Sequence, residues 1–234
     1  QLLSLIPCIK PRLYSIASSG LMHPTTIQVS IVNFRWPTPQ TKKWRNGLCT
    51  QYLFGLEPEE RPYVAVTCKK GLLQFPSDPS KPMVMFGLGT GLGVFRAFVQ
   101  EREFLAEQGV TLGRAHLWQA CRHQFKDFVY NDEIKTCMKK PGGVLEKHHP
   151  AFSHDQKEFI TIPYLMDHEP ERISMIVRDE DVQMFYCGPA YGIPQAIMDS
   201  CQQALIKTGV FAPKQAAEHM ELVKKNWFVE CFSA

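Results

Sequence analysis

Residues 83–93, with the sequence MVMFGLGTGLG, join a short apolar segment to a glycine-rich loop. The four apolar side chains of residues 83–86 predict a buried strand. From residue 93 to residue 108 apolar side chains recur at helical spacing, and Gly109 stands where a helix commonly ends. A strand, a glycine loop and a helix in this order are typical of the first unit of a parallel α/β sheet.

The same alternation continues toward the C-terminus. We expect strands at residues 116–120, 182–188 and 227–232, and helices at 127–140, 193–208 and 213–225. Asp127 is the expected cap of the first of these helices. Strands that alternate with helices form βαβ units, so residues 81–234 are interpreted as a doubly wound α/β domain with a parallel sheet.

Residues 1–80 have a different pattern. Residues 25–34 (TTIQVSIVNF) alternate apolar and polar side chains, and residues 61–70 (RPYVAVTCKK) are a second run of strand-forming residues. Proline and glycine interrupt the chain around both runs, as in antiparallel sheets and barrels. We therefore expect an antiparallel β module, which gives way to the α/β domain near residues 77–82.

The composition excludes several classes of protein. Of the 234 residues, 44% are hydrophobic and 21% are charged, which is typical of a globular chain and not of a disordered one. The 26 basic and 23 acidic residues leave a net charge of +3, too small to indicate a nucleic-acid partner. The eight cysteines form no C-x-x-C pair, which argues against a metal site and a disulfide framework. The apolar run at residues 2–6 is too short to span a membrane, so we expect a cytoplasmic chain without a membrane segment.

Four segments contain residues that could bind a ligand or take part in catalysis. Two of them lie in the glycine loop and near the N-terminus. Gly89 and Gly91 would let backbone N–H groups approach a phosphate, although the spacing is neither G-x-G-x-x-G nor a Walker A loop, and a tight turn is an equally good interpretation. In residues 12–15 (RLYS), Arg12 can pair with a pyrophosphate and Tyr14 can stack on a flat ring. Taken alone, this segment fits an ordinary strand with a core tyrosine better.

The other two segments are equally ambiguous in isolation. Residues 47–50 (GLCT) suit anion binding at the start of a helix, or simply a capped turn. Residues 186–189 (YCGP) end a predicted strand at the carboxyl edge of the sheet, where α/β folds bind ligands. A buried Cys187 there is more often part of the packing than of the chemistry.

In this order, the four segments resemble the FAD- and nicotinamide-binding half of ferredoxin–NADP reductase-like enzymes. The resemblance is closer to the C-terminal half of the diflavin reductases, the group of cytochrome P-450 reductase and the sulfite reductase flavoprotein. It runs from residue 2 to residue 233 and is strongest in PRLYSIASS, GLGTGLGVFRAFVQERE and MFYCGPA. It implies a partial antiparallel β-barrel that binds FAD over residues 1–80, with its first strands missing, and a doubly wound NAD(P)-binding α/β domain over residues 81–234.

The resemblance also implies an activity, that of an NADPH-dependent flavin oxidoreductase. Hydride would pass from NADPH, or from NADH, to FAD. Electrons would then reach FMN in a flavodoxin-like domain that this chain lacks, and finally a haem-protein acceptor. An anchor to the endoplasmic reticulum, in the parent protein, would belong to a missing N-terminal segment. Two alternatives stay open: an FAD-only reductase, and a nucleotide-binding interaction module that has lost redox activity.

Site residues follow from the resemblance motif by motif. The implied FAD contacts are Arg12, Tyr14, Ser15, Gly47, Cys49 and Thr50. The implied contacts to the nicotinamide nucleotide are Gly89, Thr90, Gly91, Arg122, Ser153, His154 and Lys157. Ser15, Cys187 and Glu230 would form a polar cluster beside the reacting rings, and Phe232 would cover the flavin as a movable gate.

The chain departs from the family pattern where the 2′-phosphate of NADPH is recognised. Ser153 is kept, but His154 stands where the family has an arginine. The positions of the family's lysine, tyrosine and glutamine hold Phe159, Thr161 and Pro163. Histidine makes no bidentate contact to phosphate, so we expect a weaker preference for NADPH over NADH, with Lys157 or Lys126 as a substitute cation. Phe232 in place of the tryptophan of the microsomal enzymes predicts a gate that opens more easily.

Overall fold

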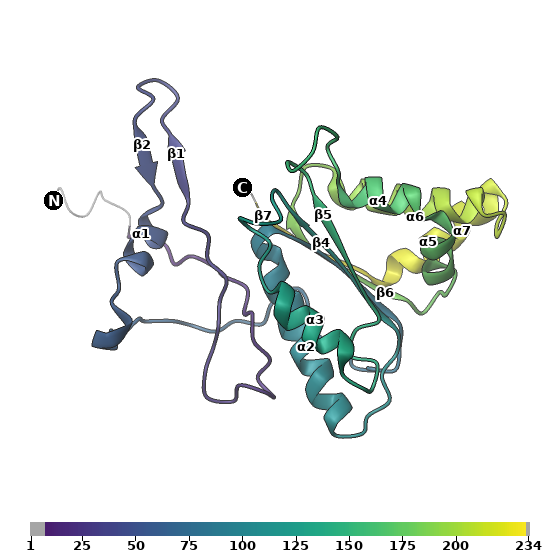
Figure 1. Ribbon diagram of the computed structural model, residues 1–234, viewed down its shortest axis with the longest axis horizontal. Helices are drawn as coiled ribbons and strands as arrows, with labels where there is room; N and C mark the ends of the chain where they lie inside the picture. Colours follow the sequence, from purple (N-terminus) through teal and green to yellow (C-terminus); the bar gives the residue numbers. More distant parts are fainter. Residues whose placement is uncertain (1–7, 233–234) are drawn as a thin grey trace.

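The computed structural model describes residues 8–232, so the apolar run at residues 2–6 lies outside the described part. Its larger part is a five-stranded, fully parallel sheet with the strand order β5-β4-β3-β6-β7 (Figure 1). The strands are β3 (Met83–Leu88), β4 (Ala115–Cys121), β5 (Lys147–Phe152), β6 (Gln183–Pro189) and β7 (Trp227–Phe232). No helix within residues 8–232 is long and apolar enough to cross a membrane.

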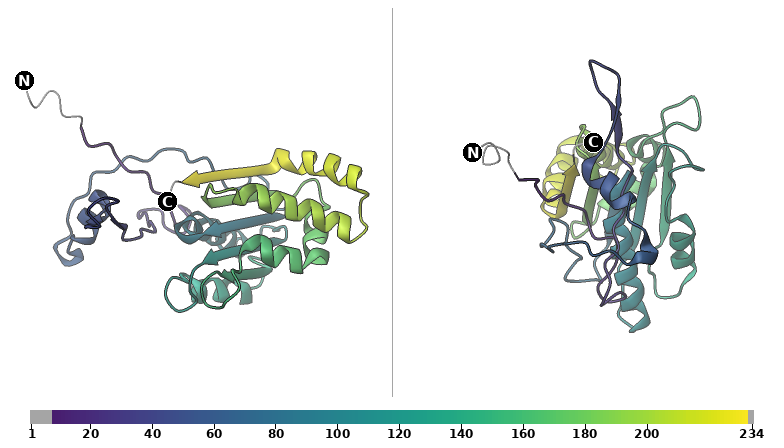
Figure 2. Two further views of the ribbon diagram at one scale, coloured as in Figure 1. Left: turned by 90° about the horizontal axis from the view of Figure 1, so that it is seen from above. Right: turned by 90° about the vertical axis from the view of Figure 1, so that its left-hand side faces the viewer.

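Helices cover both faces of this sheet (Figures 1 and 2). One face packs against α2 (Leu92–Glu107) and α3 (Asn131–Lys139) in an apolar cluster centred on phenylalanine and leucine side chains. The other face packs against α4 (Ile162–His168), α5 (Pro170–Val177), α6 (Ile193–Lys207) and α7 (Pro213–Val223). The predicted doubly wound α/β fold is therefore confirmed.

The order of the strands determines where this fold can bind a ligand. From β3 the chain moves outward through β4 to β5, and it then returns to the other side of β3 to form β6 and β7. The direction changes between β3 and β6, which makes their carboxyl ends the switch point of the sheet. A crevice at such a point is the usual ligand site of an open parallel sheet.

Most elements predicted after residue 82 are confirmed within a few residues, with one wrong boundary and three omissions. The helix expected from residue 127 begins at Asn131. Asp127 does not cap it, because its carboxylate accepts hydrogen bonds from the backbone N–H groups of Arg122 (3.0 Å) and His123 (2.7 Å) instead. β5, α4 and α5 are not among the predicted elements; the KHHPAF sequence of β5 has two histidines and a proline in place of an apolar pattern.

The N-terminal part contains little regular structure, and both long strands predicted there are wrong. Residues 25–34 contribute only a single bridge, between Val29 and Ile16, and residues 61–70 form no strand. A strand requires a neighbour to complete its backbone hydrogen bonds, and within residues 8–232 no strand pairs with these two runs beyond that single bridge. Their apolar side chains stay in contact with solvent: Ile27, Val32 and Val66 are each more than half exposed.

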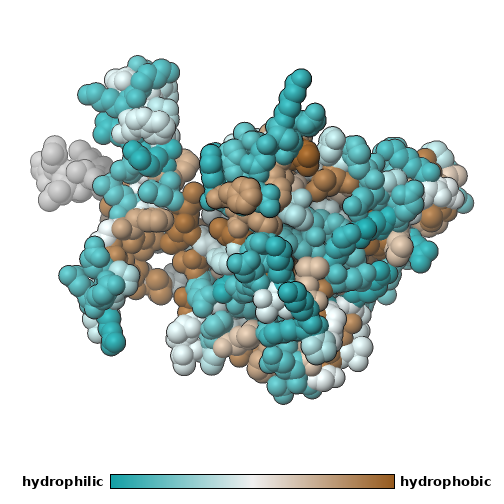
Figure 3. Space-filling model, viewed as in Figure 1, coloured by the Kyte–Doolittle hydropathy of each residue, from teal (hydrophilic) through white to brown (hydrophobic). Residues whose placement is uncertain are grey.

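The antiparallel sheet that was expected in this part consists of two short strands. These are β1 (Arg35–Pro37) and β2 (Trp44–Asn46), followed by the short helix α1 (Leu48–Phe54) and a turn of 3-10 helix at Pro58–Glu60. Apolar surface gathers beneath this hairpin (Figure 3). A closed barrel and the division of the chain at residue 80 stay predictions.

Three histidines of β4 and β5 make the stability of the fold sensitive to acid. Burial lowers the pKa of His116 to about 4, of His148 to about 4 and of His149 to about 3. The unfolded chain binds protons at these groups from pH 6.5 downward and the folded chain does not, so stability falls as the pH decreases from about 6.5 toward 4. Each pKa unit corresponds to about 1.4 kcal/mol, so we expect a loss of several kcal/mol.

Thermal unfolding at pH 7.5, 6 and 5 would measure this loss. His149 stacks on Trp118 with ring centroids 4.0 Å apart, so His149→Phe keeps an aromatic ring there but cannot be protonated. We expect this variant to lose less stability between pH 7.5 and pH 5 than the parent chain does. An equal loss in both proteins would show that His149 does not contribute to the acid sensitivity.

Candidate functional site

The glycine loop passes directly over the end of β6. A Cβ atom at Gly91 would lie 2.1 Å from the carbonyl oxygen of Cys187 and 3.2 Å from its Sγ atom, so only glycine fits. Gly89 has the left-handed φ of +56°, and a Cβ atom there would meet nothing within 4 Å. Thr90 lies between them in a 3-10 turn (Gly89–Gly91) that leads into α2. A close approach on one side and open space on the other are what a phosphate cradle requires.

Cys187, Glu230 and Ser15 meet beside this loop. Cys187 and Glu230 are directly paired across β6 and β7, and the hydroxyl of Ser15 donates a hydrogen bond to Glu230 Oε1 at 3.3 Å. Burial, with smaller contributions from Glu230 and Cys231, raises the pKa of the Cys187 thiol to about 12. The structure thus assembles the predicted polar cluster, with Cys187 as a neutral thiol at neutral pH.

Phe232 lies at the same edge. It pairs with Pro189 in the last register position of β6 and β7, and its half-buried ring packs against the apolar cluster that contains Cys187. The hydroxyl of Tyr186 donates to the carbonyl of Pro189 at 2.6 Å and fixes the end of β6. An aromatic ring therefore covers the side of the site where the last strand ends.

Two of the predicted FAD motifs also lie together. Burial and the neighbouring Cys49 raise the pKa of Tyr14 to about 12, and Arg12 stays exposed near the same ring. Thr50 is buried, and its hydroxyl donates to the carbonyl of Gly47 at 3.1 Å, which closes the GLCT turn. The RLYS and GLCT motifs therefore present a tyrosine ring, a guanidinium and a helix start to a common region.

The residues that hold the N-terminal segment against α2 are not among those predicted from the sequence. Arg96 donates to the carbonyl oxygen of Ala17 at 2.7 Å and to Oε1 of Gln28 at 2.5 Å, and it pairs with Glu133 at 2.8 Å. Gln100 accepts the backbone N–H of Ser19 at 3.0 Å. In the VFRAFVQERE sequence both residues look like ordinary polar positions of a surface helix, so no local signal reveals this role.

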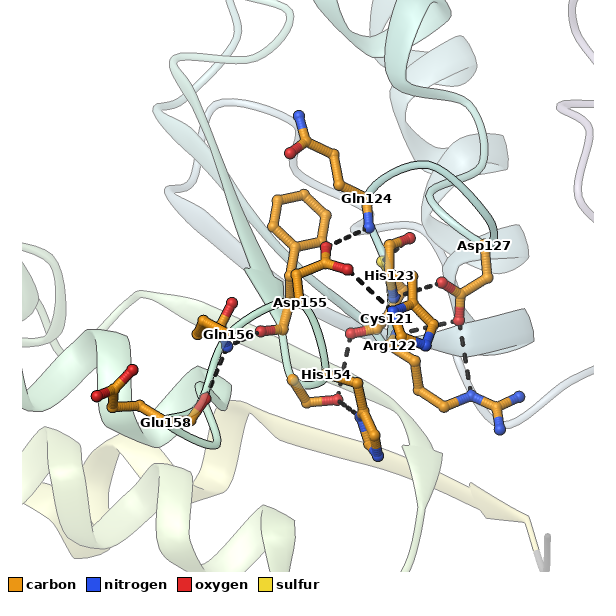
Figure 4. A network of polar contacts seen from close by, with 11 residues as sticks. Cys121, Arg122, His123, Gln124, Asp127, His154, Asp155, Gln156 and Glu158 are labelled. Carbon is orange, nitrogen blue, oxygen red and sulfur yellow. Dashed lines mark hydrogen bonds and ion pairs between the residues drawn. The ribbon is translucent and has the colours of Figure 1, made fainter.

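The residues predicted for the adenosine end lie farther out on the same carboxyl edge, after β4 and β5 (Figure 4). The Ser153 hydroxyl and His154 Nδ1 are 2.7 Å apart, and the backbone N–H of His154 donates to the carbonyl of Arg122. Asp155 accepts from the backbone N–H of Gln124 at 2.6 Å and contacts His123 Nδ1 at 2.9 Å. These hydrogen bonds lower the pKa of Asp155. Arg122, Ser153 and His154 are thus brought together.

The two candidate substitute cations differ in their surroundings. Lys157 is exposed, and no ion pair to it exists within residues 8–232. Lys126 contributes to the lowered pKa of Asp155, which places its charge near the cluster around His123. Lys126 therefore has its charge near this end of the site.

The chain is similar in sequence to known proteins. Residues 1–52 match the family model of the FAD binding domain. Over 93% of its length the chain is 32% identical to NADPH–cytochrome P450 reductase of Drosophila melanogaster, covering 32% of that protein. Over 97% of its length the chain is 31% identical to NADPH-dependent diflavin oxidoreductase 1 of Danio rerio, and it covers 37% of that protein. Over 96% of its length the chain is 27% identical to NADPH–cytochrome P450 reductase of Mus musculus, and it covers 33% of that protein.

The chain thus spans about a third of the length of these relatives. The matches extend over almost all of its residues, through both the N-terminal part and the α/β sheet. They confirm the resemblance seen in the sequence motifs: the chain is similar to the FAD- and NADP-binding half of the diflavin reductases.

Proposed function

We propose that the chain oxidises NADPH and reduces FAD, as the electron-entry module of a diflavin reductase. The observation that carries this proposal is the meeting of the glycine loop with Cys187, Glu230 and Ser15 at the switch point of the sheet. The names of the relatives support the direction of the reaction, since they are described as NADPH-dependent reductases. When bound, the two coenzymes supply the chemistry, which is the transfer of a hydride between two stacked rings.

The residues present fit both coenzymes. Arg12 would neutralise the FAD pyrophosphate and Tyr14 would pack against its ring system, with the GLCT turn adding backbone contacts. Gly89, Thr90 and Gly91 would hold the pyrophosphate of NADPH at the start of α2. Arg122 and Ser153 would bind its adenosine side. The barrel proposed for residues 1–80 would complete the FAD pocket.

The protein contributes orientation more than acid–base chemistry. The close approach of Gly91 to Cys187 fixes the glycine loop against the end of β6, where the nicotinamide would be oriented. The uncharged Cys187 thiol can contact that ring without placing a second negative charge beside Glu230. Phe232 would cover the flavin and move aside when the nicotinamide enters. Electrons would leave toward an FMN domain and then a haem protein.

Anaerobic addition of NADPH to the FAD-loaded chain tests the proposal directly. Bleaching of the yellow flavin absorbance within seconds is the expected result. A chain that binds FAD and NADPH without bleaching would contradict it and would indicate the non-redox nucleotide-binding module instead.

Glu230 is expected to act in the reaction step rather than in coenzyme binding. Glu230→Gln removes the charge beside Cys187 but keeps a hydrogen-bond acceptor for Ser15. We expect kcat to fall about 10- to 100-fold, with little change in the KM for NADPH. Cys231→Ser is the matched control, because its side chain is exposed and lies on the opposite face of the same strand. A rise in KM at constant kcat would assign Glu230 to binding.

Coenzyme preference is expected to respond to His154. An arginine offers phosphate two parallel N–H donors and a permanent charge, whereas histidine offers neither at neutral pH. His154→Arg should raise kcat/KM for NADPH about tenfold and leave that for NADH unchanged, as measured by initial rates with each coenzyme. The parent chain should discriminate weakly between the two. A strong preference of the parent for NADPH would instead point to another cation, which Lys126→Ala and Lys157→Ala would identify.

A further inference from the structure

Charge is distributed very unevenly along the chain. The first 56 residues contain no aspartate or glutamate, since the first acidic residue is Glu57. They contain six basic residues: Lys10, Arg12, Arg35, Lys42, Lys43 and Arg45. Of the 26 basic residues in the chain this leaves 20 for residues 57–234, against all 23 acidic ones, so that part has a net charge of −3. The modest total of +3 therefore hides a strongly basic N-terminal part.

Four of the six basic residues lie on the hairpin formed by β1 and β2, with the connecting turn (residues 35–46). All four side chains are exposed, and no ion pair to them exists within residues 8–232. The hairpin projects away from the α/β sheet (Figure 1), and its outer end is hydrophilic (Figure 3). None of these charges is therefore used to stabilise the fold through a carboxylate.

The hairpin is nevertheless well ordered by its own contacts. The Thr38 hydroxyl accepts the backbone N–H of Lys43 at 3.1 Å, and the Thr38 carbonyl accepts that of Lys42 at 3.0 Å. The guanidinium of Arg35 lies 5.6 Å from the ring centre of Trp44. Trp44 is 63% exposed despite this contact. A fixed turn thus presents adjacent lysines beside a large, mostly exposed aromatic ring.

We propose that this hairpin is the docking element for an acidic protein, the one-electron acceptor of the reduced flavin. Exposed tryptophan and arginine are the residue types that most often dominate protein interfaces, and unpaired lysines steer an oppositely charged partner. A membrane is a poorer occupant, because the outer turn is polar (Thr38, Pro39, Gln40, Thr41) and the tryptophans lie back along the strands. The role as electron acceptor rests on the proposed function; the acidity of the partner rests on the hairpin alone.

Flavodoxin, a small acidic one-electron protein, is a suitable probe. The FAD-loaded 234-residue chain should reduce it with NADPH at a rate that falls about tenfold between about 20 mM and about 300 mM NaCl. Lys42→Glu/Lys43→Glu should slow the low-salt rate about tenfold and remove most of the salt dependence. Reduction of menadione, a small uncharged acceptor, should not change. Lys207→Glu/Lys225→Glu is the matched control, because it makes the same change of charge at exposed positions on α6 and after α7.

Each result of this experiment has a definite meaning. The docking proposal would be overturned if the parent chain and the hairpin variant reduced flavodoxin at the same rate and with the same salt dependence. If both still reduced menadione, the proposed function would stay intact. If the parent chain reduces neither acceptor, the proposed function fails, and direct binding of flavodoxin at the two salt concentrations decides docking alone. Hairpin-dependent binding to phosphatidylserine vesicles or to a 20-mer oligonucleotide, without binding to flavodoxin, would also overturn it.

Discussion

Gly91→Ala is expected to lower NADPH-driven reduction of FAD by at least about 100-fold. The backbone conformation at Gly91 (φ −61°, ψ −18°) is one that alanine adopts freely, so conformational strain is not the cause. The cause is space, because the new methyl group would lie 2.1 Å from the carbonyl oxygen of Cys187. Neither backbone can yield without moving the glycine loop or the end of β6. A displacement of about 1 Å at such a site costs about two orders of magnitude in rate.

Stopped-flow bleaching of the flavin would measure this loss, and circular dichroism would show that the sheet is intact. Gly109→Ala is the matched control at the other end of α2. It forces alanine into a left-handed conformation (φ +77°), but its Cβ atom would meet nothing within 4 Å. It should reduce stability by about 1 kcal/mol and leave flavin reduction unchanged. Normal reduction by Gly91→Ala would show that the contact with Cys187 is not essential.

Arg102→Met is expected to destabilise the α/β fold by about 3–5 kcal/mol. Only 1% of the Arg102 side chain is exposed, and burial lowers its pKa to about 10. Its guanidinium donates to the carbonyl oxygens of Val144 (2.7 Å), Gly143 (2.9 Å) and Gly113 (2.5 Å). Methionine fills a similar volume but leaves all three carbonyl groups without these partners, and hydrogen bonds from a charged donor are worth about 1.5–3 kcal/mol each.

Urea unfolding followed by tryptophan fluorescence would measure the change in the free energy of unfolding. The matched control is Arg114→Met, because Arg114 is about half exposed and pairs with Glu146 at the surface, where an ion pair contributes about 1 kcal/mol or less. The carbonyl groups that Arg102 binds belong to the loops before β4 and β5, at the end of the sheet opposite the glycine loop. We therefore expect an unchanged KM for NADPH in Arg102→Met at low temperature. Equal stability of the two variants would show that the buried contacts contribute no more than a surface pair.

The α/β part of the fold could be predicted because its strands and helices carry local signals. Residues 227–232 were predicted as a strand with the same bounds that the structure gives to β7. The segment from β5 to α5 could not be predicted, because Pro150, Pro163 and Pro170 interrupt its apolar pattern. In the N-terminal part, strand formation depends on a partner strand, which an alternating pattern in residues 25–34 does not reveal.

The site was predictable where it depends on position in the fold and not where it depends on distant contacts. Gly91 follows β3 and Cys187 lies near the end of the adjacent parallel strand β6, so their proximity is a consequence of the strand order. The contact of Arg96 with Ala17 joins positions 79 residues apart, and periodicity contains no information about such a pair. The role predicted for Ser15 came from the motif resemblance, because elementary sequence patterns alone do not indicate it.

The bond between Ser15 and Glu230 spans 215 residues and joins the RLYS motif to the final strand. During synthesis on the ribosome, a growing polypeptide would therefore possess its glycine loop long before it possessed all the residues of the proposed redox site. Any molecule interrupted before residue 227 would lack both the carboxylate and the covering aromatic ring. Under the proposed function, reduction of FAD would therefore require translation to have passed this strand.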